Sequence, residues 1–165
     1  MIVINDHCTQ DKMAGLEIHE AAATGDYDSL EEYLKSNKFD VNLKDVEWDD
    51  RTALHWACMK GYVECIRLLI ELGADGCART AEESWTPAHF AAESGRLHAL
   101  RALFSAEIPI DRKNKYGDTP RRVAEIYGQH DCVRYLTTAE EEQSKLRKKL
   151  GIDEDSDEVL KPTKK

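Results

Sequence analysis

Three histidines recur at one position of a repeating pattern and are the side chains best suited to chemistry. His19, His55 and His89 each begin a His-x-Ala triplet. Neutral imidazole binds zinc at about 2 Å, so the set could be interpreted as metal ligands. Helices packed side by side in a stack are about 8–10 Å apart, however, and histidines from successive units cannot readily converge on one ion. The spacing therefore predicts neither a metal site nor a cofactor.

The five cysteines are the other candidates for chemistry. Their number is odd and their spacing contains no Cys-x-x-Cys pair, which is typical of a reduced, intracellular compartment. Cys65 and Cys132 each follow a glycine by four residues and are expected to be small core residues. A cysteine nucleophile needs a thiolate and an orienting partner, and no such signature surrounds Cys8, Cys58 or Cys77. Phosphate-loop, nucleophile-elbow and kinase motifs are also absent, so we expect no catalytic residue.

These histidines and most of the cysteines lie in or just after four segments of similar sequence, and these repeated segments must position the side chains. Each segment closes on a glycine, at steps of 36, 34 and 33 residues: Gly25, Gly61, Gly95 and Gly128. A threonine precedes three of the segments, where its hydroxyl can accept a hydrogen bond from the free amides of a helix start. The glycine can take the left-handed conformation that ends the helix. A second apolar stretch with helical spacing follows each glycine, and because one helix pair cannot bury it alone, the units must stack.

These segments resemble ankyrin repeats. The similarity is carried by runs such as TPAHFAAESG at residues 86–95, by LHWACMKG at 54–61 and by the Gly-Ala-Asp loop at 73–75, and it extends over about residues 14–138. The resemblance implies an all-α repeat solenoid of four stacked helix-turn-helix units with β-hairpin-like loops, followed by a C-terminal helical extension. It also implies a structural role for the recurring histidine, which would hydrogen-bond to neighbouring backbone.

The domain organisation follows from the same alignment. We expect an N-terminal arm at 1–13, repeat units at about 14–44, 45–79, 80–113 and 114–138, a helical extension at 139–151 and a charged, disordered tail at 152–165. In the extension the acids precede the bases, which suits the helix dipole. Its apolar stripe, Leu146 and Leu150, is thin. We therefore favour a solvated extension, with a coiled coil as the alternative.

Three departures from the ankyrin pattern distinguish this chain. About two extra residues lie around 46–50, where they would extend a hairpin tip without disturbing the helix stack. The last unit has Arg121 and Arg122 in place of the usual Leu-His, which fits a terminal cap with a polar outer face. The first unit lacks a Thr-Pro before Ile18 and is expected to form the other cap.

Ankyrin domains contact partners through their hairpin tips and the exposed side of the first helices, and the resemblance carries these positions over by register. Large aromatic side chains and an arginine on an acidic rim match the composition of interface hot spots. For Trp48, contact with a partner and packing against the hairpin are both open as its role. For Trp85 we favour packing, and we assign Trp56 to packing. The candidate partner-binding residues are Trp48, Asp49, Arg51, Met59, Lys60, Glu83, Trp85, Glu93, Tyr116, Asp118 and Tyr127.

The charge balance narrows the choice of partners. The net charge is −9 and no basic stripe stands out, which argues against nucleic acid. No segment is long and apolar enough for a membrane span or a secretory signal. We expect a monomeric, cytoplasmic and non-enzymatic adaptor or scaffold that binds one or more proteins of unknown identity. The alternatives are a structural subunit of a cytoskeletal or ciliary assembly and a regulator that occludes an enzyme in trans.

Overall fold

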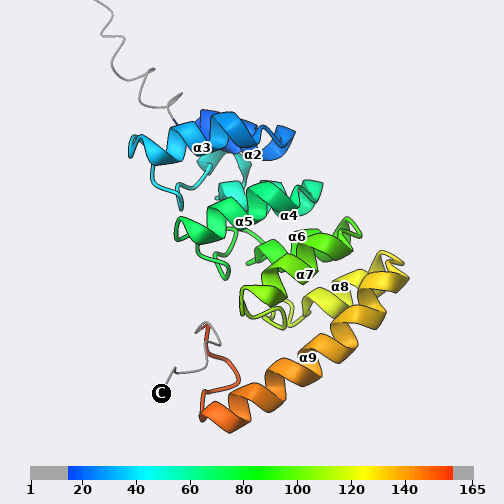
Figure 1. Ribbon diagram of the computed structural model, residues 1–165. Coiled ribbons are helices and arrows are strands. Elements are labelled where there is room, and N and C mark those ends of the chain that lie inside the picture. Colours follow the sequence, from blue (N-terminus) through cyan, green and yellow to red (C-terminus); the bar gives the residue numbers. More distant parts are fainter. Residues whose placement is uncertain (1–14, 158–165) are drawn as a thin grey trace, which may run out of the picture.

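The computed structural model describes residues 15–157, and the chain forms an all-α solenoid over this range (Figure 1). Four helix pairs follow one another along the stack. The helices are α2 (Leu16–Thr24), α3 (Tyr27–Lys35), α4 (Ala53–Lys60), α5 (Val63–Glu71), α6 (Pro87–Glu93), α7 (Leu97–Ser105), α8 (Pro120–Ile126) and α9 (His130–Leu150). A short 3₁₀ helix, η1 (Val46–Trp48), lies between α3 and α4. The predicted fold class is thereby confirmed.

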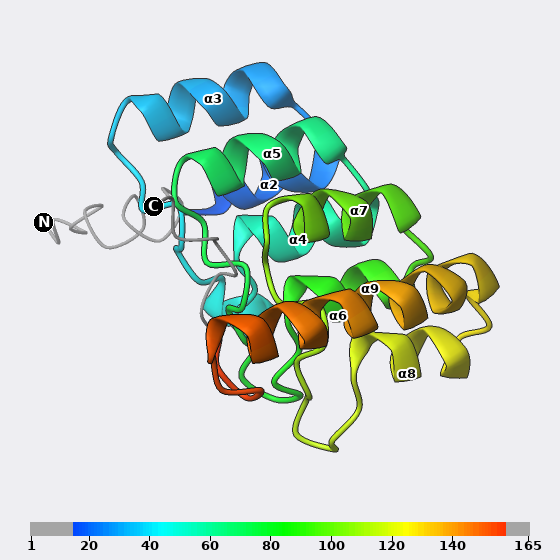
Figure 2. The ribbon, with the colours of Figure 1, turned by 60° about the horizontal axis from the view of Figure 1, so that its bottom comes forward.

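The helices form two layers, as Figure 2 shows. The first helices of the units, α2, α4, α6 and α8, pack on one another in order, and the second helices, α3, α5, α7 and α9, form the other layer. Fully buried alanines, among them Ala57, Ala91 and Ala124, allow the first helices to approach closely. The core between the layers is supplied by leucines and isoleucines of the second helices, such as Ile66, Leu69 and Leu100. Stacking thus buries the apolar faces that single units would leave exposed.

The helix ends follow the predicted chemistry. Thr52 and Thr86 each begin a first helix with a capping box, in which the threonine side chain accepts from the backbone of the third helical residue. Gly25 and Gly61 end α2 and α4 in the left-handed conformation, with φ of 77° and 82°. The first unit starts less regularly, as expected, because Gly15 stands at its N-cap and provides no side-chain hydrogen bond.

The loops between the units form hairpin-like tips that are linked to one another. A single bridge pairs Asp45 with Arg51 in the second unit. The extra residues of this tip form η1, and the two residues after it, Asp49 and Asp50, both have φ of 57°. The Asp49 carbonyl accepts from the backbone N–H of Ala81 at 3.1 Å, which ties this tip to the next one. The insertion therefore changes the tip and leaves the helix stack regular.

Helix α9 differs from the expected solvated extension. It runs unbroken from His130 to Leu150, and its later turns bury Ala139, Gln143 and Arg147. The Gln143 side chain accepts from the Ile110 N–H at 3.1 Å and donates to the Ile108 carbonyl at 2.8 Å. The expectation was wrong because two polar side chains bury this face: Gln143 satisfies the backbone of the loop before the last unit, and Arg147 pairs with the Asp111 carboxylate of that loop. An apolar stripe was not needed to bury this face.

The chain after α9 also packs on the repeats. Residues 152–157, the start of the tail predicted to be disordered, are held by Arg112, whose Nη1 donates to the Ser156 carbonyl at 2.9 Å. The rest of that tail, and the predicted arm at 1–13, lie outside the described residues. Within residues 15–157 no helix is long and apolar enough to cross a membrane.

Candidate partner-binding site

The recurring histidines hold the framework on which the site is built. In His55 and His89 the ring Nδ1 accepts from the N–H of the threonine three residues earlier, at 3.0 and 3.1 Å. The ring Nε2 of each donates to a carbonyl of the next hairpin, that of Trp85 for His55 at 3.1 Å and that of Asp118 for His89 at 3.0 Å. Each histidine thus ties a helix start to the following unit, which confirms the predicted structural role.

Both side chains are neutral at physiological pH. Burial lowers the pKa of His55 and of His89 from the usual 6.5 to about 4, against the opposing effect of the carbonyl each ring faces. The hydrogen-bond partners of His19 are different: its two ring nitrogens face the carbonyls of Gly15 at 2.6 Å and Leu43 at 2.9 Å. Over the described range, no cluster of three or more histidine, cysteine or acidic side chains has the arrangement needed for a metal ion.

The described cysteines are buried and unpaired. Burial raises the pKa of Cys58, and it raises that of Cys77 to about 12, with the nearby Asp157 carboxylate adding to the effect. A protonated thiol is a poor nucleophile and a poor metal ligand. Cys65 and Cys132 lie in the core, as predicted, and Cys77 is buried although its sequence context is that of a loop. Cys8 lies outside the described residues.

An arginine between two aromatic rings forms the centre of the candidate site. The Arg51 guanidinium lies 5.0 Å from the ring centre of Trp56 in α4 and 4.7 Å from that of Phe90 in α6. Its buried Nε has no hydrogen-bond partner among residues 15–157. Trp48 packs edge-on against Trp56 at 5.7 Å and keeps 57% of its surface exposed. The inserted tip therefore presents a tryptophan beside a stacked cation.

Five of the predicted site residues share a small cavity beside this arginine. The cavity has a volume of about 170 Å³ and is lined by Asp49, Arg51, Thr80, Glu83, Trp85, Phe90 and Glu93. Thr80 and Phe90 were missed from the sequence. Phe90 follows His89 as Trp56 follows His55, so the repeat register that assigned Trp56 to packing could have identified it as the second ring around Arg51.

Several of the predicted residues serve the framework as well as the surface. Trp85 stacks on His89 at 5.8 Å and meets Phe90 edge-on at 5.1 Å. The Asp49 carboxylate accepts from the Glu82 N–H at 2.6 Å, and Asp118 contributes its carbonyl to His89. Substitution of Trp85 or Asp49 would therefore disturb the hairpins as well as any contact with a partner, whereas the Asp118 carbonyl belongs to the backbone and is retained when the side chain is changed.

The remaining predicted residues lie on the rim. Tyr116 is 64% exposed at the last tip and donates from its hydroxyl to Glu83 at 3.2 Å. Met59 and Lys60 end α4, away from the tips, and Tyr127 follows α8. Glu93 lies between the residues of the hairpin tips and those at the helix ends, because it lines the cavity beside Arg51 and its charge raises the pKa of Tyr127. The structure thus brings the tip residues together and places Met59 and Lys60 apart from them.

Comparison with known proteins defines the class to which this architecture belongs. A family model described as ankyrin repeats in three copies matches residues 18–114 and again 76–149. The chain therefore belongs to the ankyrin-repeat family.

Three similar proteins are human protein phosphatase 1 regulatory subunit 27, mouse protein phosphatase 1 regulatory subunit 12A and human ankyrin repeat domain-containing protein 7. The first is 34% identical over 96 residues, which cover 58% of this chain and 60% of that protein. The second is 37% identical over 95 residues, or 58% of this chain and 9% of that protein. The third is 44% identical over 55 residues, which cover 33% of this chain and 21% of that protein. The chain thus spans at most three-fifths of the length of these relatives.

Proposed function

We propose that the chain is a non-enzymatic adaptor that binds a partner protein through its hairpin tips and the exposed side of its first helices. The observation that carries the proposal is the exposed Trp48 beside Arg51, whose guanidinium is stacked between two rings. A pre-organised arginine loses little side-chain freedom on binding, and tryptophan and arginine are the residues that most often dominate interface energies. The paired positive φ values at Asp49 and Asp50 are a backbone feature of the kind that recurs at binding sites.

The surface around Arg51 also suggests the chemistry of the partner. Asp49, Glu83 and Glu93 line the same cavity as Arg51, and the chain as a whole carries a net charge of −9. A partner segment with an apolar side chain for Trp48 and a cation for these carboxylates would be complementary to the site. Charge complementarity of this kind favours fast association and the correct register.

A second function in this class is regulation of an enzyme in trans. It is supported by the two relatives whose names describe regulatory subunits of protein phosphatase 1. A chain that covers an enzyme's active site would use the same tip surface, so inhibition of a captured enzyme by the purified chain distinguishes the regulator from a passive scaffold. A structural subunit of a cytoskeletal or ciliary assembly, the third candidate, would instead co-purify in stoichiometric amount with filaments.

Two narrower points belong to the same proposal. The runs at residues 85–95 and 117–129 also resemble ankyrin repeat domain-containing protein 66, and we propose a relationship with that protein on this ground.

We further propose a cytoplasmic, monomeric protein without nucleic-acid or membrane partners. The unpaired cysteines support the reducing compartment, and the net negative charge disfavours nucleic acid.

Replacing Trp48 with alanine is expected to weaken capture of the partner at least about tenfold, because truncating a central interface tryptophan typically costs about 2 kcal/mol or more. The full chain and its variants serve as bait, and the same captured proteins are quantified by mass spectrometry. Trp48→Ala should leave the thermal midpoint nearly unchanged, whereas the double change with Trp85 also removes packing against His89. Tyr27→Ala, a half-exposed aromatic on α3, is the matched control. Equal capture by Trp48→Ala and the control would rule out this site.

A further inference from the structure

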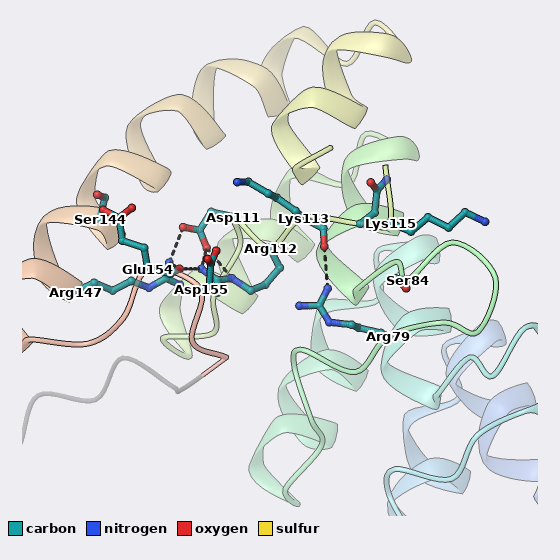
Figure 3. A pocket seen from close by; sticks show the side chains of 11 residues that line it. Arg79, Ser84, Asp111, Arg112, Lys113, Lys115, Ser144, Arg147, Glu154 and Asp155 are labelled. Carbon is teal, nitrogen blue, oxygen red and sulfur yellow. Dashed lines mark hydrogen bonds and ion pairs between the residues drawn. The ribbon is translucent and has the colours of Figure 1, made fainter. Parts of the chain in front are cut away.

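A second surface, at the loops of the third and fourth units, gathers positive charge. A cavity of about 480 Å³ lies between the loops of the third and fourth units and the end of α9. Figure 3 shows its side chains coming from these three elements and from the segment that follows α9. We call it the basic groove, and its cations are Arg79, Arg112, Lys113, Lys115 and Arg147.

The charge of the basic groove is unusual for this chain. Apart from the segment after α9, the only acid among its lining residues in the described range is Asp111, which pairs with Arg147 at 2.7 Å and with Arg112 at 2.9 Å. Glu83 lies nearby and pairs with Lys115 at 3.5 Å. Without the segment after α9, five cations would face only Asp111 and the nearby Glu83, and the groove would attract anions although the chain has a net charge of −9.

The chain's own C-terminal segment occupies part of the basic groove. Residues 151–157, which we call the acidic strap, contain Asp153, Glu154, Asp155 and Asp157. Arg112 and Arg147 both donate to the backbone carbonyl of Glu154, the latter at 3.0 Å. Asp157 lies 3.4 Å from Arg79 and 3.9 Å from Arg112. The structure thus displays an acidic peptide seated on the groove.

The fit between strap and groove is incomplete. Arg147 is 1% exposed, and its Nε and Nη2 have no hydrogen-bond partner within residues 15–157. These two atoms form one edge of the guanidinium, the fork that matches two carboxylate oxygens. The carboxylates of Glu154 and Asp155 line the groove but make no ion pair in the described part of the chain. Burying a charged donor edge without an acceptor is costly, so the closed arrangement carries a penalty.

We propose that the acidic strap is a displaceable cover and that the basic groove binds an acidic peptide segment of a partner protein in its place. A glutamate or aspartate of the incoming segment would supply the two oxygens that the Arg147 fork lacks. Further carboxylates would pair with Arg79, Lys113 and Lys115, which are accessible at the rim. The proposal depends on other residues than the Trp48 surface and stands if that surface proves inactive.

The experiment uses the full chain and a fluorescein-labelled hexaglutamate peptide, with binding followed by fluorescence anisotropy. Asp157→Asn removes the ion pairs of the strap with Arg79 and Arg112, and Asp155→Asn lowers its negative charge at the groove lining. Together they should tighten peptide binding about tenfold, because the peptide then competes with a weaker occupant. The matched control, Asp28→Asn with Glu64→Gln, removes the same charge from exposed positions on α3 and α5. Adding Lys113→Glu and Lys115→Glu to the strap variant should abolish binding, and these exposed changes leave the buried arginines intact.

Hydrogen exchange provides the second readout. Amides of residues 151–157 should exchange faster when the peptide is bound, because the strap leaves the groove. The proposal is overturned if hexaglutamate does not bind the strap variant, if the lysine changes leave binding unaltered, or if the strap amides do not respond. Equal competition by millimolar inorganic phosphate and by unlabelled hexaglutamate would also overturn it, since the groove would then select any anion rather than an acidic peptide.

Discussion

The free energy of unfolding is expected to fall by about 4–6 kcal/mol as the pH is lowered from 7 to 4. Burial lowers the pKa of both His55 and His89 from 6.5 to about 4. Between these pH values the unfolded chain takes up a proton at each position and the folded chain does not, so acid favours unfolding. Each pKa unit corresponds to about 1.4 kcal/mol, which gives roughly 2–3 kcal/mol for each histidine. The loss starts near pH 6.5 and levels off below pH 4.

The charges around the two rings leave this direction unchanged. His55 faces Arg51, whose charge lowers its pKa further, and Asp49, whose charge opposes that effect. The charge of Arg79 likewise lowers the pKa of His89, and the charge of Asp118 raises it. In each case burial is the largest cause.

Urea unfolding followed by circular dichroism at a series of pH values tests this prediction. His55→Asn should lower stability at pH 7, because the Thr52 amide and the Trp85 carbonyl lose their partner. It should also remove about half of the pH dependence between pH 6.5 and 4, because His89 still contributes the other half. His98→Gln, at an exposed position of α7, should change neither the stability nor the profile. A wild-type free energy that stays constant from pH 7 to pH 5 would contradict the assignment of buried, neutral histidines.

Replacing Leu69 with alanine is expected to lower the free energy of unfolding by about 3–4 kcal/mol. Leu69 is fully buried on α5 in the shared core, where removal of its side chain loses apolar burial and leaves a cavity. Leu72, which follows the same helix and is 38% exposed, supplies the control, and Leu72→Ala should cost less than about 1 kcal/mol. Differential scanning calorimetry and urea unfolding measure both variants.

The shape of the Leu69→Ala transition carries further information. Units of a solenoid contact only their neighbours, and a damaged central interface separates the first unit from the last two. We expect the transition to shift as a whole or to broaden. If Leu69→Ala and Leu72→Ala cost the same, the packing of the second helices into a continuous core would be contradicted.

The sequence predicts most of the fold because the repeat encodes its own local structure. Threonine before each regular first helix, glycine after it and histidine three residues into it have roles that depend on neighbours within one unit or the next. His55 and His89 therefore hydrogen-bond as the resemblance implied. The solvated extension was mispredicted because Gln143 and Arg147 are polar, and hydrophobic periodicity does not detect a face buried through hydrogen bonds and ion pairs.

The candidate site was only partly accessible from the sequence. Repeat register located the tip residues, but the stacking of Arg51 between Trp56 and Phe90 depends on how two neighbouring units pack. The basic groove was missed for the same reason. Arg112, Lys113 and Lys115 form only a short basic cluster, and Arg79 and Arg147 each lie more than thirty residues from it, so the sequence does not show that these cations meet.

Hydrogen exchange of the chain alone and in complex with its captured partner tests the central claim most directly. Partner binding is expected to protect the amides of residues 46–51 and 80–93, around Trp48 and Arg51. The outer helices α3 and α5 should exchange at the same rate in both states. Protection confined to α3 and α5, with residues 46–51 unaffected, would contradict a partner-binding surface at the hairpin tips.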